Sequence, residues 1–212
     1  MTVNVERKGF DPIGYRNASS WNGQCNMYYI GSGDATATFV GDLLKATDSV
    51  TVAADSDLAY GKPLVVQAAA GATTNIHVGV AVSFNQHLGV SVANMVLSRI
   101  HRPASVGMYV LVADDPNTVF SLQSDDDTET ATVDYVGANG DIIVAAGSTT
   151  TGRSGMELDI STVETTATLP IKVVGIVNSN NNAFIAAQDT NVKFKVMLNA
   201  SIRNFGTLGQ DD

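Results

Sequence analysis

The feature that most constrains this chain is a succession of short apolar runs, rich in Val, Ile, Thr and Ala. Gly, Asn or Asp interrupts them about every 8 to 12 residues from Phe39 to the end. Helical periodicity is scarce, and such runs are typical of short strands joined by turns. The sequence therefore predicts a mainly β protein made of small β-barrel or β-sandwich units, with an extended N-terminal arm and little helix.

The candidate strands share a β-branched, apolar character and are bounded by turn residues. They cover residues 37–40, 64–68, 78–83, 109–113, 119–123, 142–145, 171–177 and 192–198. In the last of these, apolar residues alternate with Lys193, Lys195 and Met197, so one of its faces is expected to contact water. Helices are expected at only two places, residues 90–100 and 161–169. In the second, Ser161 and Glu164 have the spacing of a capping box.

A repeated pattern suggests how the chain is divided. Gly41-Asp42 precedes an apolar pair, and Gly140-Asp141 does the same; each is followed about 35 residues later by a Val-Gly strand. Two related β units explain this pattern, and so does chance similarity. The expected division is an arm at 1–36, a first β unit at 37–100 and a second at 101–212, or one continuous β domain.

The first 36 residues differ from the rest because aromatic residues alternate there with Gly, Pro and Asn. This mixture is rich in turn formers yet too aromatic for a free linker. We expect an arm that docks on an acidic neighbour, with large aromatics as anchors. An arm folded onto its own subunit is the alternative. The candidate contact residues are Phe10, Tyr15, Arg16, Trp21, Tyr28 and Tyr29.

Charge and hydropathy exclude several classes of partner. Twelve Lys and Arg against 21 Asp and Glu give a net charge of -9, so the basic surface that binds nucleic acid is missing. Neither an apolar leader nor a run of about 18 apolar residues occurs, so we expect no secretion signal and no membrane span. Only 16% of the residues are charged, which suits a protein packed against other proteins.

Residues 147–154 contain the closest match to a ligand-binding motif. Gly147, Gly152, Arg153 and Ser154 fit the phosphate-loop pattern except that Arg153 replaces the lysine. A phosphate loop opens into a helix whose N-terminus holds the phosphates, and residues 155–159 are a poor helix sequence. We therefore predict a loop between strands and no bound nucleotide.

Other residues that could carry chemistry are scattered. His77, His87 and His101 lack zinc-site spacing and are expected at surface or interface positions. The acidic run at 125–129 lacks the glycine turn of a calcium loop, and Cys25 has neither a second cysteine to pair with nor a histidine near it in sequence. The sequence thus predicts no catalytic site, no cofactor and no metal ion, and a protein that is not an enzyme.

Several segments resemble virion structural proteins of tailed bacteriophages, and together they span nearly the whole chain. They are GFDPIGY at 9–15, WNGQ at 21–24, YYI at 28–30, FVGD at 39–42, DDPN at 114–117, TGRSGMELD at 151–159 and TTATL at 165–169. Proteins of this size and composition in such phages are similar to capsid decoration (cement) proteins. These are small β-rich oligomers, often trimers, on the outside of the major capsid protein lattice.

This resemblance implies a structural protein on the outer surface of the virion capsid. Its partners would be the major capsid protein and further copies of itself, as a homotrimer, with no nucleic acid and no membrane. An aromatic arm that binds many times across a symmetric lattice gains affinity through multivalency. A minor head-completion or tail protein is the first alternative, and a carbohydrate-binding β module the second. Five of the fourteen aromatic residues lie in the arm, which favours protein contact over sugar binding.

Overall fold

The computed structural model describes residues 7–47, 62–71, 77–85, 100–125, 131–179, 182, 191–199 and 201. These residues form thirteen strands and one short 3₁₀ helix, so the expected mainly β class is confirmed. The strands are β1 (Asp11–Tyr15), β2 (Asn26–Ile30), β3 (Thr38–Phe39), β4 (Leu43–Ala46), β5 (Val65–Gln67), β6 (His77–Asn85), β7 (His101–Arg102), β8 (Met108–Ala113), β9 (Thr118–Gln123), β10 (Asn139–Ile143), β11 (Glu157–Glu164), β12 (Ile171–Ile176) and β13 (Lys193–Leu198), and the helix is η2 (Val133–Tyr135).

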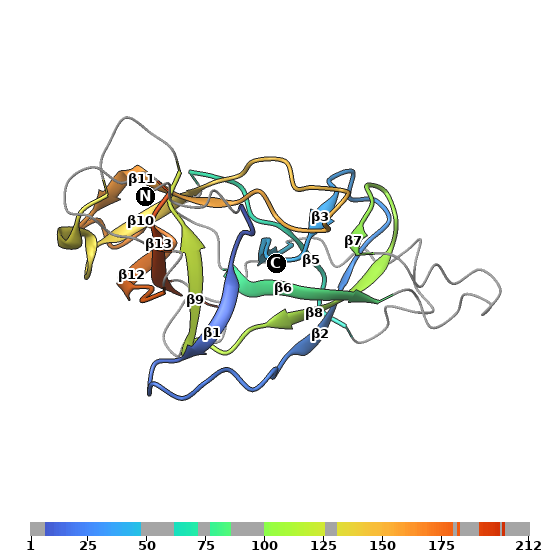
Figure 1. Cartoon of the computed structure of the whole chain (residues 1–212). Helices are drawn as coiled ribbons and strands as arrows, with labels where there is room; N and C mark the ends of the chain where they lie inside the picture. Colours follow the sequence, from blue (N-terminus) through green and yellow to red (C-terminus); the bar gives the residue numbers. More distant parts are fainter. Residues whose placement is uncertain are drawn as a thin grey trace.

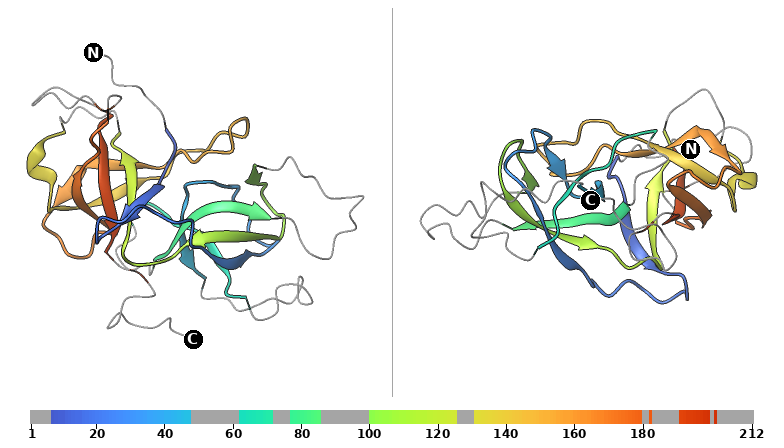
Figure 2. Two further views of the ribbon diagram at one scale, coloured as in Figure 1. Left: turned by 60° about the horizontal axis from the view of Figure 1, so that its bottom comes forward. Right: turned by 180° about the vertical axis from the view of Figure 1, so that it is seen from behind.

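Two antiparallel sheets form neighbouring halves of the molecule (Figures 1 and 2). The six-stranded sheet has the order β1-β9-β13-β12-β10-β11, and the five-stranded sheet has the order β2-β8-β6-β4-β5. Strands β3 and β7 form a separate pair. Isolated bridges between Ser124 and Leu158, and between Tyr29 and Leu64, bring distant strands of each sheet together. Each sheet therefore curls round part of the core, as expected of barrel-like or sandwich-like units.

All eight candidate strands overlap observed ones, but strands β1, β2, β4, β7 and β11 were not expected. The expected helix at 161–169 is wrong, because β11 runs to Glu164 and pairs with β10. Ser161, the expected helix cap, instead donates its hydroxyl to Asp159 Oδ1 at 2.6 Å, and β-branched neighbours such as Val163 favour a strand. Of the other expected helix, residues 90–99 lie outside the described residues.

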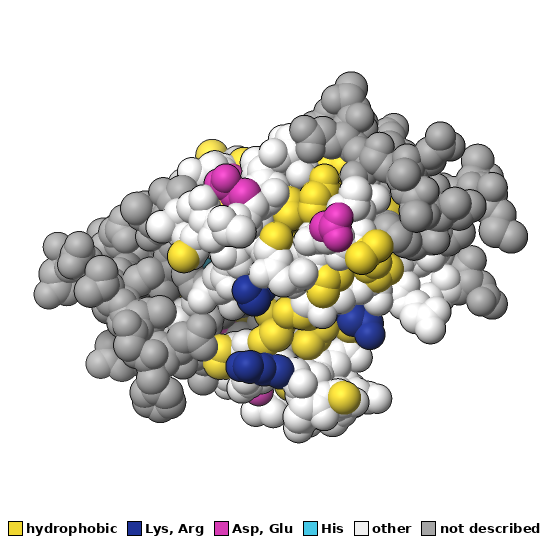
Figure 3. All heavy atoms as spheres, turned by 90° about the vertical axis from the view of Figure 1, so that its left-hand side faces the viewer, with side chains coloured by type: hydrophobic (Ala, Val, Ile, Leu, Met, Phe, Trp, Pro, Cys, Tyr) yellow, Lys and Arg dark blue, Asp and Glu magenta, His cyan; other side chains and the backbone are white. Residues whose placement is uncertain are grey.

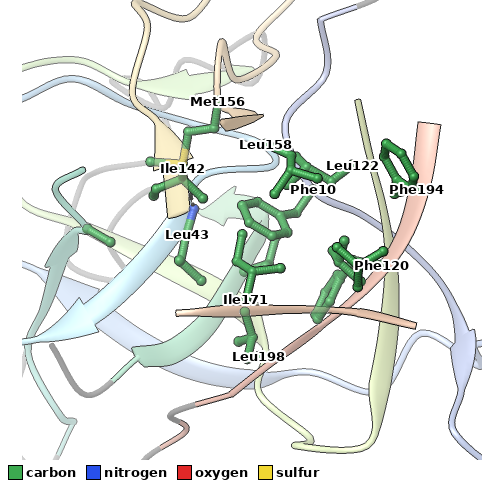
Figure 4. Packing of buried hydrophobic residues seen from close by; sticks show 14 of the residues in the cluster. Phe10, Leu43, Phe120, Leu122, Ile142, Met156, Leu158, Ile171, Phe194 and Leu198 are labelled. Carbon is green, nitrogen blue, oxygen red and sulfur yellow. Dashed lines mark hydrogen bonds between the residues drawn. The ribbon is translucent and has the colours of Figure 1, made fainter. Parts of the chain in front are cut away.

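The main core cluster joins the two sheets. The six-stranded sheet contributes most of its inward side chains, including Phe120, Val196 and Ile171, and the five-stranded sheet contributes Leu43 and Val80. Figure 4 shows the ring of Phe10 among these side chains, between Leu43 on one side and Phe120 on the other. A second cluster, which includes Ile30, Leu44 and Val110, belongs to the five-stranded sheet alone. Burial in the main cluster is therefore the force that holds the two sheets together, whereas the second cluster stabilises the five-stranded sheet itself.

The repeated Gly-Asp pattern corresponds to similar pairings in the two sheets. Strand β4 follows Gly41-Asp42 and pairs with β6, which contains Gly79. Strand β10 contains Gly140-Asp141 and pairs with β12, which contains Gly175. Both later strands also have a register shift, as a bulge produces. The pattern thus marks pairs of strands that lie side by side in each sheet.

Neither sheet is built from one of the three sequential segments expected from the sequence. Residues 7–36 supply β1 to the six-stranded sheet and β2 to the five-stranded sheet. Strand β8, although beyond residue 100, lies in the five-stranded sheet beside β6. The chain therefore passes between the two sheets several times, which ties them together.

A tight backbone junction holds the N-terminal segment between the sheets. Phe10 N donates to Gly41 O at 2.9 Å, and Ser154 N donates to Val40 O at 2.8 Å. Gly9 and Gly41 have positive φ values of 65° and 95°. A Cβ on Gly9 would overlap the carbonyl oxygen of Gly41, so the close approach requires glycine there.

Candidate interaction surface

Three of the six candidate contact residues are buried within this chain. Phe10 packs edge to face on Phe120, with ring centroids 5.9 Å apart. The Tyr28 hydroxyl donates to Asp114 Oδ2 at 2.6 Å, and Tyr29 is fully buried in β2. Strand β2 pairs along its whole length with β8. These aromatics contribute to the protein's own core, as in the alternative of an arm folded onto its own subunit.

The other three candidate residues lie at or near the surface. Arg16 is exposed and Tyr15 is half-buried, in the turn that follows β1. This turn is held by hydrogen bonds from Arg16 N to Asn117 O and from the Tyr15 hydroxyl to Asn22 Oδ1. Trp21 is partly buried against the main core, and its indole nitrogen is buried without a hydrogen-bond partner among the described residues. Tyr15, Arg16 and Trp21 therefore remain available as contact residues.

Tyr15 and Arg16 border a shallow groove of about 460 Å³ on the outer face of the six-stranded sheet. We call this surface the outer face. It arises because β13 and β12 alternate: inward side chains are buried and outward ones reach water. The groove is lined by Ile13, Gly14, Tyr15, Arg16, Ala18, Ser19, Ser20, Val119, Val174, Lys195 and Met197.

The outer face combines apolar and basic side chains. Ile13 and Val174 each expose 37% of their surface, whereas Arg16 and Lys195 bring positive charge to the groove. None of the described residues that line the groove is acidic. Lys172, exposed in β12, donates to Gly137 O at 3.1 Å, in the turn between η2 and β10. On the side of the molecule seen in Figure 3, hydrophobic side chains lie between groups of Lys and Arg.

Beside this groove lies a second, polar one of about 480 Å³, which also contacts Tyr15 and Arg16. Its amides and hydroxyls are of the kind that bind sugar hydroxyls. However, Asn22 Oδ1 already accepts from Tyr15 and from Gln24 N, and Asp115 Oδ1 accepts from the backbone and side chain of Asn117. Much of its hydrogen-bonding capacity is therefore used to shape the turns.

The segment that resembles a phosphate loop is a turn between strands. Gly152 N donates to Ser148 O at 2.7 Å, and Ser148 N donates to Arg153 O at 2.9 Å. No helix follows this loop directly, as the sequence predicts; the next element is strand β11, which overlaps the helix expected at 161–169. Figure 1 shows the connection from β10 to β11 reaching across to β3, where Arg153 forms a bridge with Val40. Its role in the described structure is to link the six-stranded sheet to the β3 and β7 pair.

The histidines, the cysteine and the acidic run do not assemble into a reactive site in the described structure. His77 is buried in β6, which contradicts its expected surface position, because β6 is covered on both faces. His101 stacks on Phe39, with ring centroids 5.0 Å apart. His87 and residues 126–129 lie outside the described residues. No group of three or more metal-binding side chains occurs among the residues that the structure describes.

Among the described residues, burial raises the pKa of three titratable groups. Desolvation raises the pKa of Asp42, although hydrogen bonds from Ser154, from Phe39 N and from Gln67 oppose it. Desolvation also raises the pKa of Glu157; the Arg7 guanidinium, 3.1 Å away, lowers it, and Asp125 raises it further. Burial and then the Asp114 charge raise the pKa of the Cys25 thiol. A thiol with a raised pKa is a weak nucleophile at neutral pH.

Sequence reasoning missed the role of Ile13, Val174 and Lys195 on the outer face. The alternation in residues 192–198 placed Lys195 on a wet face, and this prediction is confirmed. Ile13 carried no such signal, because Pro12 and Gly14 beside it indicate a turn rather than a strand.

No helix among the described residues has the length and apolar character needed to cross a lipid bilayer. No protein-family model, no curated protein and no solved structure matches this chain.

Proposed function

We propose that this chain is a non-enzymatic structural protein of a bacteriophage particle. As a homotrimer it binds the outside of the major capsid protein lattice and stabilises the head. The observation that carries the proposal is the outer face, where Ile13 and Val174 are exposed between Arg16 and Lys195. An exposed apolar surface rimmed by charge is characteristic of a protein interface. The resemblance to phage virion proteins supplies two kinds of partner, the capsid protein lattice and further copies of this chain, and the outer face is suited to contact between copies.

The rest of the molecule is compatible with a bracing role. Its two sheets share one core and the chain crosses repeatedly between them, so a load applied to one sheet is carried by the other. The low share of charged residues suits broad contacts with other proteins. A net charge of -9 favours solubility and repels nucleic acid outside the shell.

The test uses phage heads assembled without this protein. Purified protein is added, bound protein is measured by cosedimentation, and its place is found by electron microscopy of the particles. We expect regular density on the outer shell and heads that withstand more heat. Density confined to the tail or to one vertex would instead indicate the tail or head-completion alternative.

A carbohydrate-binding module is the second candidate, because the polar groove places amide side chains beside Tyr15. Binding to a glycan panel that disappears in Tyr15→Ala would favour it over the capsid role. We expect no glycan binding, since the groove's amides are already engaged in turns.

A further inference from the structure

We propose that the outer face binds a second copy of this chain, through the acidic and apolar surface around η2 of that copy. The inference deepens the proposed function and rests on it for the premise that the chain acts as an oligomer. Its two surfaces are the outer face, defined above, and an η2 patch made of Val133, Asp134 and Val136.

Exposed apolar side chains are concentrated on these two surfaces. Five large hydrophobic residues are exposed among the described residues, and four of them lie here: Ile13 and Val174 on the outer face, Val133 and Val136 on the η2 patch. Val133 and Val136 expose 54% and 43% of their surface. Single exposed apolar residues are ordinary, but two such groupings beside the same sheet indicate contact surfaces.

The charges of the two surfaces are complementary. The outer face has Arg16 and Lys195 beside its apolar centre. Without these two cations, the chain has ten basic residues against 21 acidic ones, so a second copy offers an acidic surface more readily than a basic one. On the η2 patch, Asp134 is exposed between the two valines. Each copy therefore has both surfaces of the proposed contact. One is apolar with positive charge at its edge, and the other is apolar with negative charge at its edge.

The surfaces are also held rigidly enough to act as an interface. η2 is tied to the six-stranded sheet by Gly137 N, which donates to Val173 O at 2.8 Å, and by the Tyr135 ring, which lies 6.4 Å from that of Phe194. The outer face consists of strands paired on both sides, apart from edge strand β1. Little conformational freedom is lost when such surfaces meet, which favours association.

Sedimentation velocity of the full chain tests the proposal with two charge reversals, Lys195→Glu and Asp134→Lys. We expect the wild type to associate at micromolar concentration and each variant to have a dissociation constant at least about tenfold higher, because like charges then face each other. An equimolar mixture of the two variants should associate again, since each supplies the surface that the other lacks. Lys62→Glu, a reversal at an exposed lysine beside the five-stranded sheet, is the matched control and should behave as wild type.

Three results would overturn the proposal: a monomeric wild type, single variants that associate like the wild type, or a mixture that associates no better than either variant. Far-UV circular dichroism confirms that the variants are folded. Binding of wild type to phage heads is measured separately. Head binding by a monomeric chain would overturn this inference and the homotrimer, and would leave only the capsid-binding role of the proposed function standing. Self-association through these surfaces without head binding would support this inference and overturn the capsid-binding role.

Discussion

The two sheets differ in how many of their faces are covered. In β8 of the five-stranded sheet, five of six consecutive residues are buried, whereas in β13 of the six-stranded sheet buried and partly exposed residues alternate. Val110 faces the second core cluster, and Tyr109 on the opposite side packs on Tyr29 at 5.2 Å between ring centroids. The five-stranded sheet therefore has packing partners on both faces along β8, and the six-stranded sheet leaves one face open along β13.

This difference separates two roles of apolar residues in one β protein. Where both faces are covered, a strand reads as a nearly continuous apolar run, and its residues serve stability. Where one face is open, the strand alternates, and its outward residues are free to serve contact with another molecule. The outer face belongs to the second kind, which is why lysines and exposed valine occur there together.

The largest effect is expected from deletion of residues 1–30, which removes one strand from each sheet. Phe10, Tyr28, Tyr29 and Ile30 leave the core, and the edges of β8 and β9 lose their partners. We expect a chain without a cooperative transition in urea, monitored by circular dichroism because the deletion removes Trp21, the one tryptophan. A truncated protein that unfolds cooperatively near the wild-type midpoint would show that the two sheets do not depend on this segment. Arg16→Ala, in the same segment but exposed, should remain folded.

The second prediction concerns Arg102 in β7, which lies in a part of the molecule where side chains are covered by packing. Its fully buried guanidinium donates to Val106 O, Gly31 O and Thr36 O, and pairs with Asp34 at 3.2 Å. Arg102→Ala removes a fully buried side chain and leaves the Asp34 carboxylate without its ion-pair partner, so it should lower the free energy of unfolding by about 3 to 5 kcal/mol. Arg153→Ala, at an exposed turn, should change it by less than about 0.5 kcal/mol. Equal effects of the two variants would contradict the assigned role of Arg102.

Alanine substitutions at two adjacent residues in one strand of each sheet test directly whether one face or both faces of that strand are covered. In β13, Phe194→Ala should cost about 3 to 5 kcal/mol of unfolding free energy, whereas Lys195→Ala should cost less than about 0.5 kcal/mol. In β8, Tyr109→Ala and Val110→Ala should each cost more than about 1 kcal/mol, because both side chains are buried. Urea denaturation of the four variants measures this. A strongly destabilised Lys195→Ala or a neutral Tyr109→Ala would remove the distinction.

The smallest expected effect is on pH dependence, through Asp42. Its pKa is raised above the ordinary value of 3.8 in the folded state, so the folded protein holds this proton more tightly than the unfolded chain does. The stability that Asp42 contributes is therefore present at low pH and is lost as pH rises through the raised pKa. In Asp42→Asn the free energy of unfolding should fall less with rising pH over this range than in wild type. A steeper fall in the variant would mean that the sign is wrong, and identical slopes would mean that Asp42 does not titrate there.

Much of the fold could be predicted from the sequence, and particular residues show where prediction stopped. The Val-rich runs were correctly assigned as strands because β-branched composition and the turn residues at their ends are local signals. Strands β1 and β2 were missed because Pro12, Gly14 and Asn26 indicate turns, and only pairing with β9 and β8 extends them. The helix expected at 161–169 failed for a related reason, since pairing with β10 outweighed a capping signal at Ser161.

The candidate contact residues divide in the same way. Composition correctly indicated that the aromatic side chains of residues 7–30 pack against protein. It did not indicate whether they pack against their own chain or against another molecule. Tyr28 and Tyr29 are adjacent in sequence and both buried, each against a different cluster. Ile13, beside two turn-forming residues, is exposed on the outer face. Burial of this kind depends on partners far apart in the sequence.

The sequence by itself determined the class of fold, the positions of most strands and the wet face of β13, because the period of apolar residues fixes which side chains can share a face. Only the tertiary structure decided which strands are neighbours, that the N-terminal segment is divided between both sheets, and that Ile13 and Val174 meet Arg16 and Lys195 on one surface. These features depend on contacts between β1, β9, β12 and β13, which lie up to about 180 residues apart, and such contacts leave no local periodicity in the chain.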